Sequence, residues 1–539
     1  MSVAPTALDA LTLARWQFGI TTVYHFILVP LTIGLSLFVA CMQTMWVRTG
    51  KDYWLKATRL FGKLFLINFA LGVSTGIVQE FQFGMNWSEY SRYVGDIFGA
   101  PLAVEALLSF FLESTFIGLW IFGWGRLSKK AHTAMIWLAA LGVNTSALWI
   151  IGANSWMQHP VGAVFNPETG RAELDGTSGF LKVVFNPTLW LAWVHVLTTS
   201  WLLSAGLIAG VAMWWMVRTA RTGATTSAAV TEVEAAKTTG ATTTGSSVAG
   251  TNSSEVHPAA GDGRSEALAE SKNIWHPIVR FGLMLMLISG ILTAITGHAE
   301  GVHMVAEQPT KMAAAEAICS TQSHAPFTIA AFGNECGKDG KGITHIGEIP
   351  SIASILSGNT PSTEVQGMNN LNEAYAGDYG VDKVTPPVMA TFWSFRAMIG
   401  FGLLSVLFAI IGLYATRKGK VTTSTALSKF GLAMMPMPLL GIAFGWIFTE
   451  IGRQPFVVFP NNLADPVGQV WMLTQYGVSG AVPAVQVLLT MILFTVLYGA
   501  LGVVWFLLMV RYAKEGVHTP KESEEHAEHA DDKSLSFAY

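Results

Sequence analysis

The sequence predicts an all-α membrane protein with nine transmembrane helices, because it is apolar, poor in charge and divided into long apolar runs. Of its 539 residues, 51% are hydrophobic and 12% are charged, and the mean hydropathy is +0.44. Soluble domains contain about twice that proportion of charged residues. Each run reaches the roughly 20 residues that a helix needs to cross a bilayer. No basic run indicates nucleic acid as a partner.

The nine runs follow a short start that lacks a basic n-region, so we expect no cleaved signal peptide. Several runs are at least one turn longer than the minimum, which predicts tilted helices or helices that project beyond the hydrocarbon layer. The runs cover residues 14–46, 60–80, 97–124, 131–153, 183–217, 276–297, 390–416, 427–450 and 483–512.

The distribution of Lys and Arg between the runs predicts the orientation. Cations follow the first, third, seventh and ninth runs, whereas the connections 81–96 and 154–182 carry few. Cytoplasmic connections are enriched in Lys and Arg. We therefore expect the N-terminus outside and the C-terminus in the cytoplasm.

Three segments outside the runs differ in composition. Residues 218–275 are rich in Ala, Thr, Gly and Ser without an apolar period, which predicts a disordered cytoplasmic linker. Residues 298–389 form a long outer segment that we expect to be an ordered binding loop. Residues 513–539 are a charged cytoplasmic tail. Cys319 and Cys336 lie in the outer segment, where oxidising conditions favour a disulfide over the alternative of two free thiols.

Four side chains in the apolar runs are candidate haem ligands: His25, His195, Met398 and Glu450. Ionisable groups within a membrane are costly and are therefore functional candidates. His195 and Met398 lie at similar depth, roughly 13–18 Å below the outer boundary at about 1.5 Å per residue, as an axial His/Met pair requires. A histidine hydrogen-bonded to a neighbouring helix and a core methionine are the alternatives. His25 and Glu450 also lie in the outer half of the bilayer.

Two carboxylates in one apolar run, Glu105 and Glu113, are eight residues apart. On an α-helix they form a slanted column, which indicates a proton relay that runs inward. A hydrogen bond to Ser or Asn on another helix is the alternative.

Three arginines and one tryptophan lie close to the candidate ligands. The guanidinium groups of Arg15, Arg396 and Arg453 suit haem propionates, although arginines that extend to the membrane surface would look the same. Trp446 precedes Glu450 by one helical turn and could assist electron transfer between haems or simply pack.

Longer stretches resemble subunit I of the cytochrome bd-type quinol:oxygen oxidases over nearly the whole chain. QFGITTVYHFILVPLT resembles the haem-ligand motif of the first helix, and GKLFLINFALGVSTGIVQEFQFGMNWSEYSRYVGDIFGAPLAVEALLSFFLEST resembles the second and third helices. SFRAM and GWIFTEIGRQPF resemble late motifs, although Phe456 stands where the family commonly has Trp. The outer segment is similar to the short-loop type, and residues 218–275 look like an insertion.

The resemblance implies a set of cofactors. His195 and Met398 would bind a low-spin haem b, and His25 and Glu450 would serve two high-spin haems, one b and one d. Which high-spin haem occupies which position stays open. Glu105 would lie beside the haem that reduces oxygen.

The resemblance also implies a proton path and a quinol site. Glu113, with Ser146 below it, would carry protons from the cytoplasm. Lys311 and Glu316, spaced as in QPTKMAAAEA, match the quinol-oxidation loop, and Glu316 could accept a quinol proton. The nearby cysteine pair would stiffen this loop.

The expected protein is the haem-bearing subunit of a respiratory oxidase in the bacterial cytoplasmic membrane. It would oxidise menaquinol or ubiquinol at the outer face and reduce O2 to water with cytoplasmic protons, generating a proton gradient without pumping. A second subunit would be its partner, with or without small single-span subunits. A proton-coupled transporter, an oxidase with only b-type haems and a redox sensor are the rival interpretations, and matched repeats typical of a transporter are not evident in the sequence.

Overall fold

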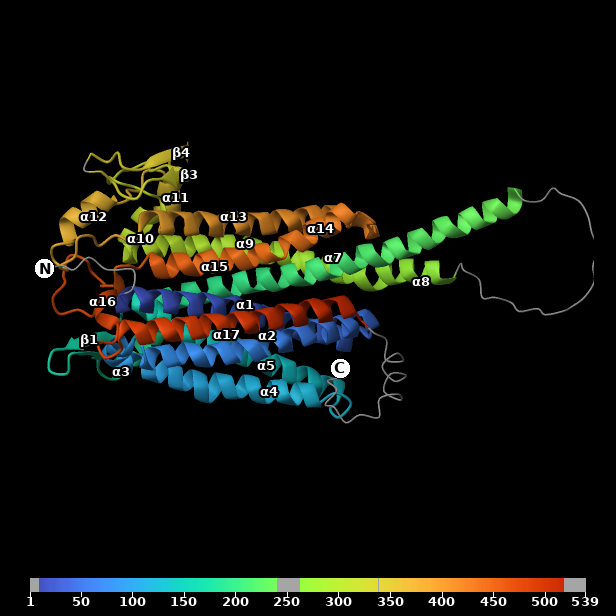
Figure 1. Cartoon of the computed structure of the whole chain (residues 1–539), viewed down its shortest axis with the longest axis horizontal. Coiled ribbons are helices and arrows are strands. Elements are labelled where there is room, and N and C mark those ends of the chain that lie inside the picture. Colours follow the sequence, from blue (N-terminus) through green and yellow to red (C-terminus); the bar gives the residue numbers. More distant parts are fainter. Residues whose placement is uncertain (1–8, 240–261, 338, 518–539) are drawn as a thin grey trace, which may run out of the picture.

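Nine helices lie side by side in one elongated bundle (Figure 1) within residues 9–239, 262–337 and 339–517, which the computed structural model describes. Each is long and apolar enough to cross a membrane, so the predicted fold class is confirmed. The spans are formed by α1 (Ala10–Thr49), α2 (Asp52–Gly84), α3 (Ser88–Val104) continuing into α4 (Phe111–Phe122), α5 (Lys129–Gln158), α7 (Pro187–Thr239), α9 (His276–Glu307), α13 (Val388–Ala415), α14 (Thr425–Met434) continuing into α15 (Pro436–Ile451), and α17 (Ala484–Glu515).

The centre of the bundle is formed mainly by α1 and α7, which are the most buried spans. Small residues permit close approach of the helices there: a Cβ on Gly34 would lie 2.3 Å from the backbone oxygen of Ser200, and one on Gly282 would lie 2.8 Å from the backbone nitrogen of Ala209. Close packing through small residues is typical of helices in membranes. Large apolar side chains such as Leu489 on α17 face outward instead.

The segments between the spans gather mostly at the end of the bundle where α1 begins (Figure 1). Residues 298–307 prolong α9, so the outer loop begins ten residues later than predicted. The loop is ordered, as expected. Its elements are α10 (Pro309–Ala315), β3 (Phe327–Phe332), β4 (Thr344–Ile349), α11 (Ile352–Gly358) and α12 (Met368–Tyr375), and the same end of the bundle holds β1 (Ala163–Asn166), β2 (Arg171–Leu174), β5 (Phe456–Val458), β6 (Met472–Leu473) and α16 (Thr474–Gly477).

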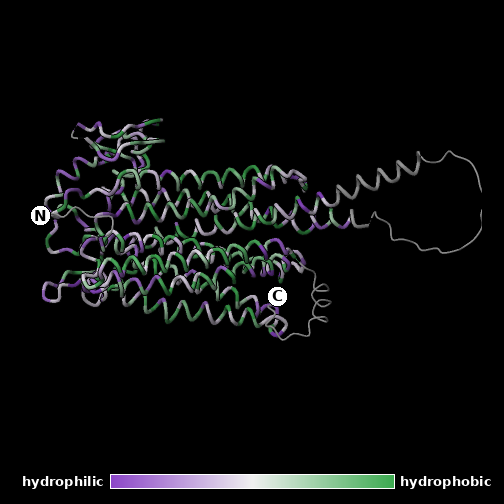
Figure 2. Tube along the Cα trace, viewed as in Figure 1, coloured by the Kyte–Doolittle hydropathy of each residue, from purple (hydrophilic) through white to green (hydrophobic). Residues whose placement is uncertain are grey.

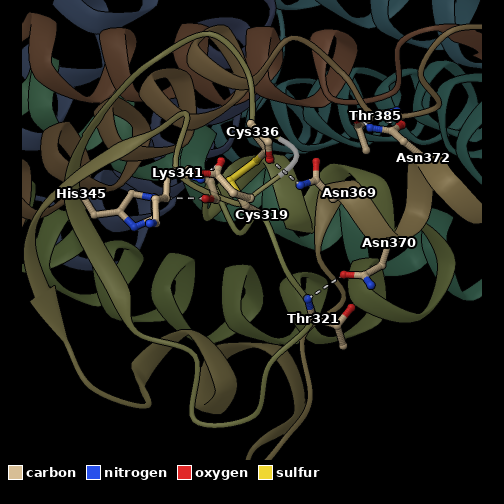
Figure 3. Close-up of a disulfide and its surroundings, with 12 residues drawn as sticks. Cys319, Thr321, Cys336, Lys341, His345, Asn369, Asn370, Asn372 and Thr385 are labelled. Atoms are coloured by element: carbon tan, nitrogen blue, oxygen red, sulfur yellow. Dashed lines mark hydrogen bonds between the residues drawn. A yellow bond between two sulfur atoms is a disulfide. The ribbon is translucent and has the colours of Figure 1, made fainter.

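A disulfide between Cys319 and Cys336 closes part of this outer loop (Figure 3), which agrees with the favoured alternative. Hydrogen bonds from the same stretch reach α12. The side-chain amide of Asn369 donates to the carbonyl oxygen of Gly337 (2.9 Å), and the backbone N–H of Thr321 donates to Oδ1 of Asn370 (2.9 Å). The bridge therefore belongs to a small folded unit rather than to a loose connection.

The prediction that residues 218–275 are a disordered linker is wrong at both ends. Helix α7 continues to Thr239, and residues 262–275 form α8 (Asp262–Glu270) and a π-helical turn that leads into α9. Trp275 stacks on Trp215 with ring centroids 5.3 Å apart, and this contact anchors the turn against α7. Alanine, abundant in the segment, is the strongest helix former. Residues 240–261, the middle of the predicted linker, and residues 518–539, most of the predicted tail, lie outside the described residues.

Hydrophilic residues gather at both ends of the bundle, and apolar residues dominate between them (Figure 2). The connections that carry most cations, from α1 to α2, α4 to α5 and α13 to α14, lie at the end opposite the outer loop (Figure 1). The described chain begins at one end and finishes at the other, as an odd number of spans requires. Which end faces the cytoplasm stays a prediction from the charge distribution.

Candidate functional site

The His195 imidazole on α7 is held by a threonine of α9. Its Nδ1 lies 3.0 Å from Oγ1 of Thr296, and that hydroxyl donates its own proton to the carbonyl oxygen of Leu292 (2.9 Å). Because a hydroxyl has one proton, Oγ1 must accept from Nδ1–H. The Nε2 lone pair of His195 is therefore available to a metal, which is the role that such outer partners fix in metal sites.

The His25 imidazole on α1 is held in the same way by α2. Its Nδ1 lies 2.9 Å from Oγ1 of Thr75, which donates to the carbonyl oxygens of Leu71 and Gly72 (both 3.0 Å). The same proton count leaves Nε2 of His25 free as an acceptor or ligand.

A glycine follows the threonine in both places. A Cβ on Gly76 would lie 3.2 Å from Cε1 of His25, and a Cβ on Gly297 would lie 3.0 Å from Cε1 of His195. Each imidazole thus packs against a helix surface that has no side chain at this position. The two sites share one local design, a Thr-Gly pair on the neighbouring helix.

Met398 on α13 faces α15, where a Cβ on Gly445 would lie 3.0 Å from its sulfur. The next residue, Trp446, stacks on Phe26 with ring centroids 4.2 Å apart, and Phe26 follows His25 in α1. Trp446 and its neighbour therefore contact both the helix that carries His25 and the side chain of Met398. The indole Nε1 of Trp446 is buried without a hydrogen-bond partner among the described residues.

Glu450 lies in a network of charge-assisted hydrogen bonds at the end of α15. Its Oε1 accepts from Nδ2 of Asn154 (2.7 Å), and its Oε2 accepts from Nη2 of Arg453 (2.6 Å). The Arg453 side chain is 3% exposed, yet its Nε and Nη1 have no partner among the described residues. Buried N–H groups of a guanidinium need acceptors, so this arginine fits the predicted contact with an anionic group such as a haem propionate.

Arg396 forms its hydrogen bonds with the outer loop. Its Nη2 donates to Oε2 of Glu316 (2.6 Å), its Nε donates to the carbonyl oxygen of Thr328 (2.7 Å), and its Nη1 contacts Glu316 and the carbonyl oxygen of Ala315. Each of its nitrogens therefore has a protein acceptor in the outer loop, and its role toward a haem propionate stays a prediction. The sequence placed Arg396 beside Met398 only because the two are adjacent on one helix, whereas the guanidinium extends into the outer loop.

Lys311 and Glu316, the predicted quinol-loop residues, are both buried at the outer end of the bundle. Burial lowers the pKa of the Lys311 ammonium to about 7. Burial also raises the pKa of the Glu316 carboxyl to about 7, although Arg396 acts in the opposite direction. Both groups can therefore change protonation near neutral pH, where general acid–base groups are most effective.

A chain of hydrogen bonds joins Lys311 of the outer loop to the candidate haem ligand Glu450. Nζ of Lys311 donates to Oε1 of Gln158 (2.8 Å), whose Nε2 donates to Oδ1 of Asn154 (2.9 Å), whose Nδ2 donates to Glu450. The sequence analysis missed Gln158 and Asn154. They are one turn apart at the end of a span, a spacing that could have indicated a shared polar face.

Arg15 lies at a cavity of about 400 Å³ between the start of α1 and the outer loop. Its Nη2 donates to Oε1 of Gln454 (2.6 Å), the residue that follows Arg453. The side chain is exposed, and its role toward a haem propionate stays a prediction.

Glu105 and Glu113 flank a π-helical turn, Glu105–Phe110, within the third span. A π-turn rotates less per residue than an α-turn, so the two carboxylates project closer to one face than α-helical spacing predicts. Ser146 donates to Oε1 of Glu105 (2.8 Å). The sequence analysis had placed Ser146 below Glu113 instead. That placement was wrong because the register of α5 against the third span is not visible in the sequence.

A pair of hydrogen-bonded hydroxyl groups lies between the two carboxylates along the helix. Ser109, which is fully buried, donates to Oγ1 of Thr145 (3.1 Å), and the sequence analysis missed both residues. The polar contacts between the third span and α5 thus form a ladder from Glu105 toward Glu113. The close approach of the two helices at Glu113 depends on Gly142, where a Cβ would lie 2.6 Å from the Glu113 backbone nitrogen.

Comparison with known proteins decides the family. The protein-family model described as cytochrome bd terminal oxidase subunit I matches residues 13–266 and 237–517 of this chain. The chain belongs to this family. It is 38% identical to the cytochrome bd ubiquinol oxidase subunit 1 of Bacillus subtilis (strain 168), over 94% of each chain. It is 35% identical to the cytochrome bd-II ubiquinol oxidase subunit 1 of Escherichia coli (strain K12), over 94% of this chain and 97% of that one.

The fold is also that of a solved bd oxidase. A chain from the bd oxidase structure of Geobacillus thermodenitrificans superposes with a TM-score of 0.74 at 23% identity, over 95% of this chain and 100% of that one. The predicted family, oxidoreductase class and bacterial membrane location are therefore confirmed. Membership of the bd family implies haem cofactors, and the histidine sites and Arg453 have the chemistry to hold them.

Proposed function

We propose that this bd-family subunit binds haem through His195 and Met398 and through His25 and Glu450, and uses quinol to reduce O2 to water. The observation that carries the proposal is the repeated histidine site. In two separate helix pairs, a threonine accepts from Nδ1 and leaves Nε2 unprotonated. Two histidines with purely structural roles would not need to share this arrangement. When bound, haem supplies one-electron redox chemistry and a site for O2.

We propose different haems for the two sites. His195 and Met398 would supply the imidazole and the thioether that hold a low-spin haem b. His25 and Glu450 are single ligands for the high-spin haems, one b and one d, whose order stays open. Trp446 lies between the two regions through its stack on Phe26, and Arg453 offers two unpartnered nitrogens to a propionate.

The relatives are named as ubiquinol oxidases, and we propose that this chain oxidises quinol at the outer loop. Glu316, ionised above about pH 7, accepts a quinol proton, and Arg396 holds its carboxylate in place. Lys311 is held by Gln158 and is poised to change protonation in the same range. We propose menaquinol or ubiquinol as the substrate here.

The protons for water are proposed to come from the cytoplasmic side through Glu113 and then Glu105. Ser146 positions the Glu105 carboxylate, and the buried Ser109 bridges the distance along the helix. Because quinol protons leave outside and water protons arrive from inside, charge separation generates a proton gradient without a pump.

A second subunit completes the proposed enzyme, with small single-span subunits as further partners. Large apolar side chains remain exposed along α4 and α17, and in the bilayer they face either lipid or another apolar helix.

The test is a reduced-minus-oxidised spectrum of the purified membrane complex, recorded for the wild type and for His195→Ala. We expect b-type bands with an added far-red haem d band, and selective loss of the low-spin b signal in the variant. His324→Ala, which changes an exposed histidine of the outer loop, should match the wild type. Absence of all haem would overturn the proposal in favour of a transporter, and b bands alone would indicate an oxidase without haem d.

A further inference from the structure

A group of three potential metal ligands lies at the outer end of the bundle. It contains none of the candidate haem ligands. It consists of His159, which follows α5, and of His303 and Glu307, which are one turn apart on α9. One nitrogen of each imidazole and one carboxylate oxygen lie within 4.8 Å of one another. Within the described ranges, this is the one such group of His, Cys, Asp or Glu.

The chemistry of the three side chains matches a zinc site. Two imidazoles and one carboxylate, with a fourth position left open, are an established ligand set for Zn²⁺. With bonds of about 2.0–2.1 Å, tetrahedral ligand atoms lie about 3.3 Å apart. Nε2 of His159 and Oε2 of Glu307 are already 3.2 Å apart. His303 completes the group, because its ligand atom lies within 4.8 Å of the other two.

Neighbouring groups orient both imidazoles. Oγ1 of Thr188 lies 3.1 Å from Nδ1 of His159 and 2.7 Å from Nε2 of His303. The Thr188 backbone N–H in turn donates to Oδ1 of Asn186 (3.0 Å), and Asn186 is buried and donates to the carbonyl oxygen of His159 (3.1 Å). Outer contacts of this kind orient metal ligands. The side chains of His159 and Glu307 remain 16% and 24% exposed, so an ion can reach them.

We propose that His159, His303 and Glu307 form a binding site for a divalent transition-metal ion, for which Zn²⁺ is the probe. The ion bridges the end of α5 to the end of α9. Glu307 directly precedes Gln308, which begins α10 and whose Nε2 donates to the carbonyl oxygen of Gln158 (2.9 Å). Gln158, next to His159, also accepts from Lys311. A bound ion therefore stiffens the support of the quinol loop.

This coupling gives the site a regulatory effect, and this part rests on the proposed function. An ion that fixes Gln158 and Gln308 restricts the movement of Lys311 when substrate enters. Zn²⁺ should therefore slow quinol oxidation several-fold without changing the haem spectrum. Metal binding itself does not depend on the quinol assignment.

Binding is tested on the purified complex after treatment with EDTA, by equilibrium dialysis against ZnCl2 with a metal count per haem. We expect one Zn²⁺ per complex to be lost, with at least tenfold weaker binding, in His303→Ala and in Glu307→Gln. The matched control is His298→Ala, on the same helix, whose Nε2 contacts Asn359 and which is not part of the group. Equal binding by wild type and His303→Ala would overturn the site.

Two further measurements keep the outcomes distinct. Unchanged haem spectra of the variants show that they fold, and the zinc K-edge absorption of the loaded complex should report imidazole and oxygen ligands. A spectrum without imidazole would overturn the site even if zinc bound. If zinc bound at this site but quinol oxidation were unaffected, the metal site would stand and the regulatory coupling would be wrong.

Discussion

The two histidine sites use the same local design but differ in what supports them. At both, a Thr-Gly pair of a neighbouring helix holds the imidazole. At His195, the threonine is approached by a second hydroxyl from the same helix as the histidine, because Oγ1 of Thr198 lies 3.2 Å from Oγ1 of Thr296. The hydrogen bonds that support the His195 imidazole therefore come from α7 and α9.

The His25 site depends on a third helix. Tyr498 of α17 donates through its phenol to the backbone carbonyl oxygen of Thr75 (3.0 Å). Helix α17 is the span with the smallest buried share and carries exposed side chains such as Leu493. The His195 site thus belongs to the centre of the bundle, whereas the His25 site extends to its edge. Changes at the surface of α17 should reach His25 and leave His195 unaffected.

The largest effect is expected from removing Met398, the proposed second ligand that only the His195 site has. Met398→Leu keeps the size of the side chain but removes the thioether, so the haem at His195 should become high-spin while the His25 haem is unchanged. Quinol oxidase activity should fall by at least about 100-fold, since loss of outer contacts alone costs roughly 10–100-fold. Electron paramagnetic resonance measures the spin states, and Met284→Leu, exposed on α9, is the control. A retained low-spin signal would mean that Met398 is not a ligand.

The two threonines should act separately. Thr75→Val and Thr296→Val each remove the acceptor for Nδ1–H, and each should lower retention of its own haem by about tenfold or shift its reduction potential. The serine variants at the same positions keep the hydroxyl and should restore the wild-type values. Haem content and spectroelectrochemical titration provide the readout. If both valine variants changed the same haem, the conclusion that each threonine supports its own site would be wrong.

The pH dependence of quinol oxidation should come from neither histidine site. Glu316, with a pKa of about 7, is protonated below that pH and can accept a proton only above it, so kcat/KM should rise with pH through about 7. Lys311 loses its charge in the same range, which produces a fall at higher pH if the cation is needed. The rise should disappear in Glu316→Gln, with roughly tenfold lower activity at neutral pH.

Two controls separate this effect from the haem sites. Glu364→Gln changes an exposed carboxylate of the same loop and should keep the wild-type profile. Thr296→Val should lower the activity without moving the profile. A rise that persisted in Glu316→Gln would show that another group accepts the proton.

The smallest expected effect concerns the support from α17. Tyr498→Phe removes one hydrogen bond to the Thr75 carbonyl, and a typical hydrogen bond contributes about 1 kcal/mol. The reduction potential of the His25 haem should therefore shift slightly, with a few-fold change in its retention, while the His195 haem stays the same. Tyr24→Phe, whose ring lies 4.7 Å from that of Tyr498, tests packing without this hydrogen bond. Equal shifts at both haems would contradict the dependence on α17.

The spans and the chemistry of the candidate ligands can be predicted from local sequence. Apolar run length is a local property that the bilayer thickness sets, so all nine predicted runs correspond to spans within the described residues. A histidine or carboxylate inside such a run is conspicuous for the same reason, since burial of an ionisable group is costly. His25, His195 and Glu113 could be selected without knowing any neighbour.

Only the tertiary structure decided which side chains meet. Thr296 is 101 residues from His195, and Glu316 is 80 residues from Arg396, so no local pattern reveals either pair. The pairing of Ser146 with Glu105 depends on the register of two helices, which the π-helical turn changes. The direction of the Arg396 side chain depended on the fold of the outer loop. The depth of a residue in the membrane follows from its position along one helix. Contacts between helices follow from packing between residues that are far apart in the sequence, so no local pattern reveals them.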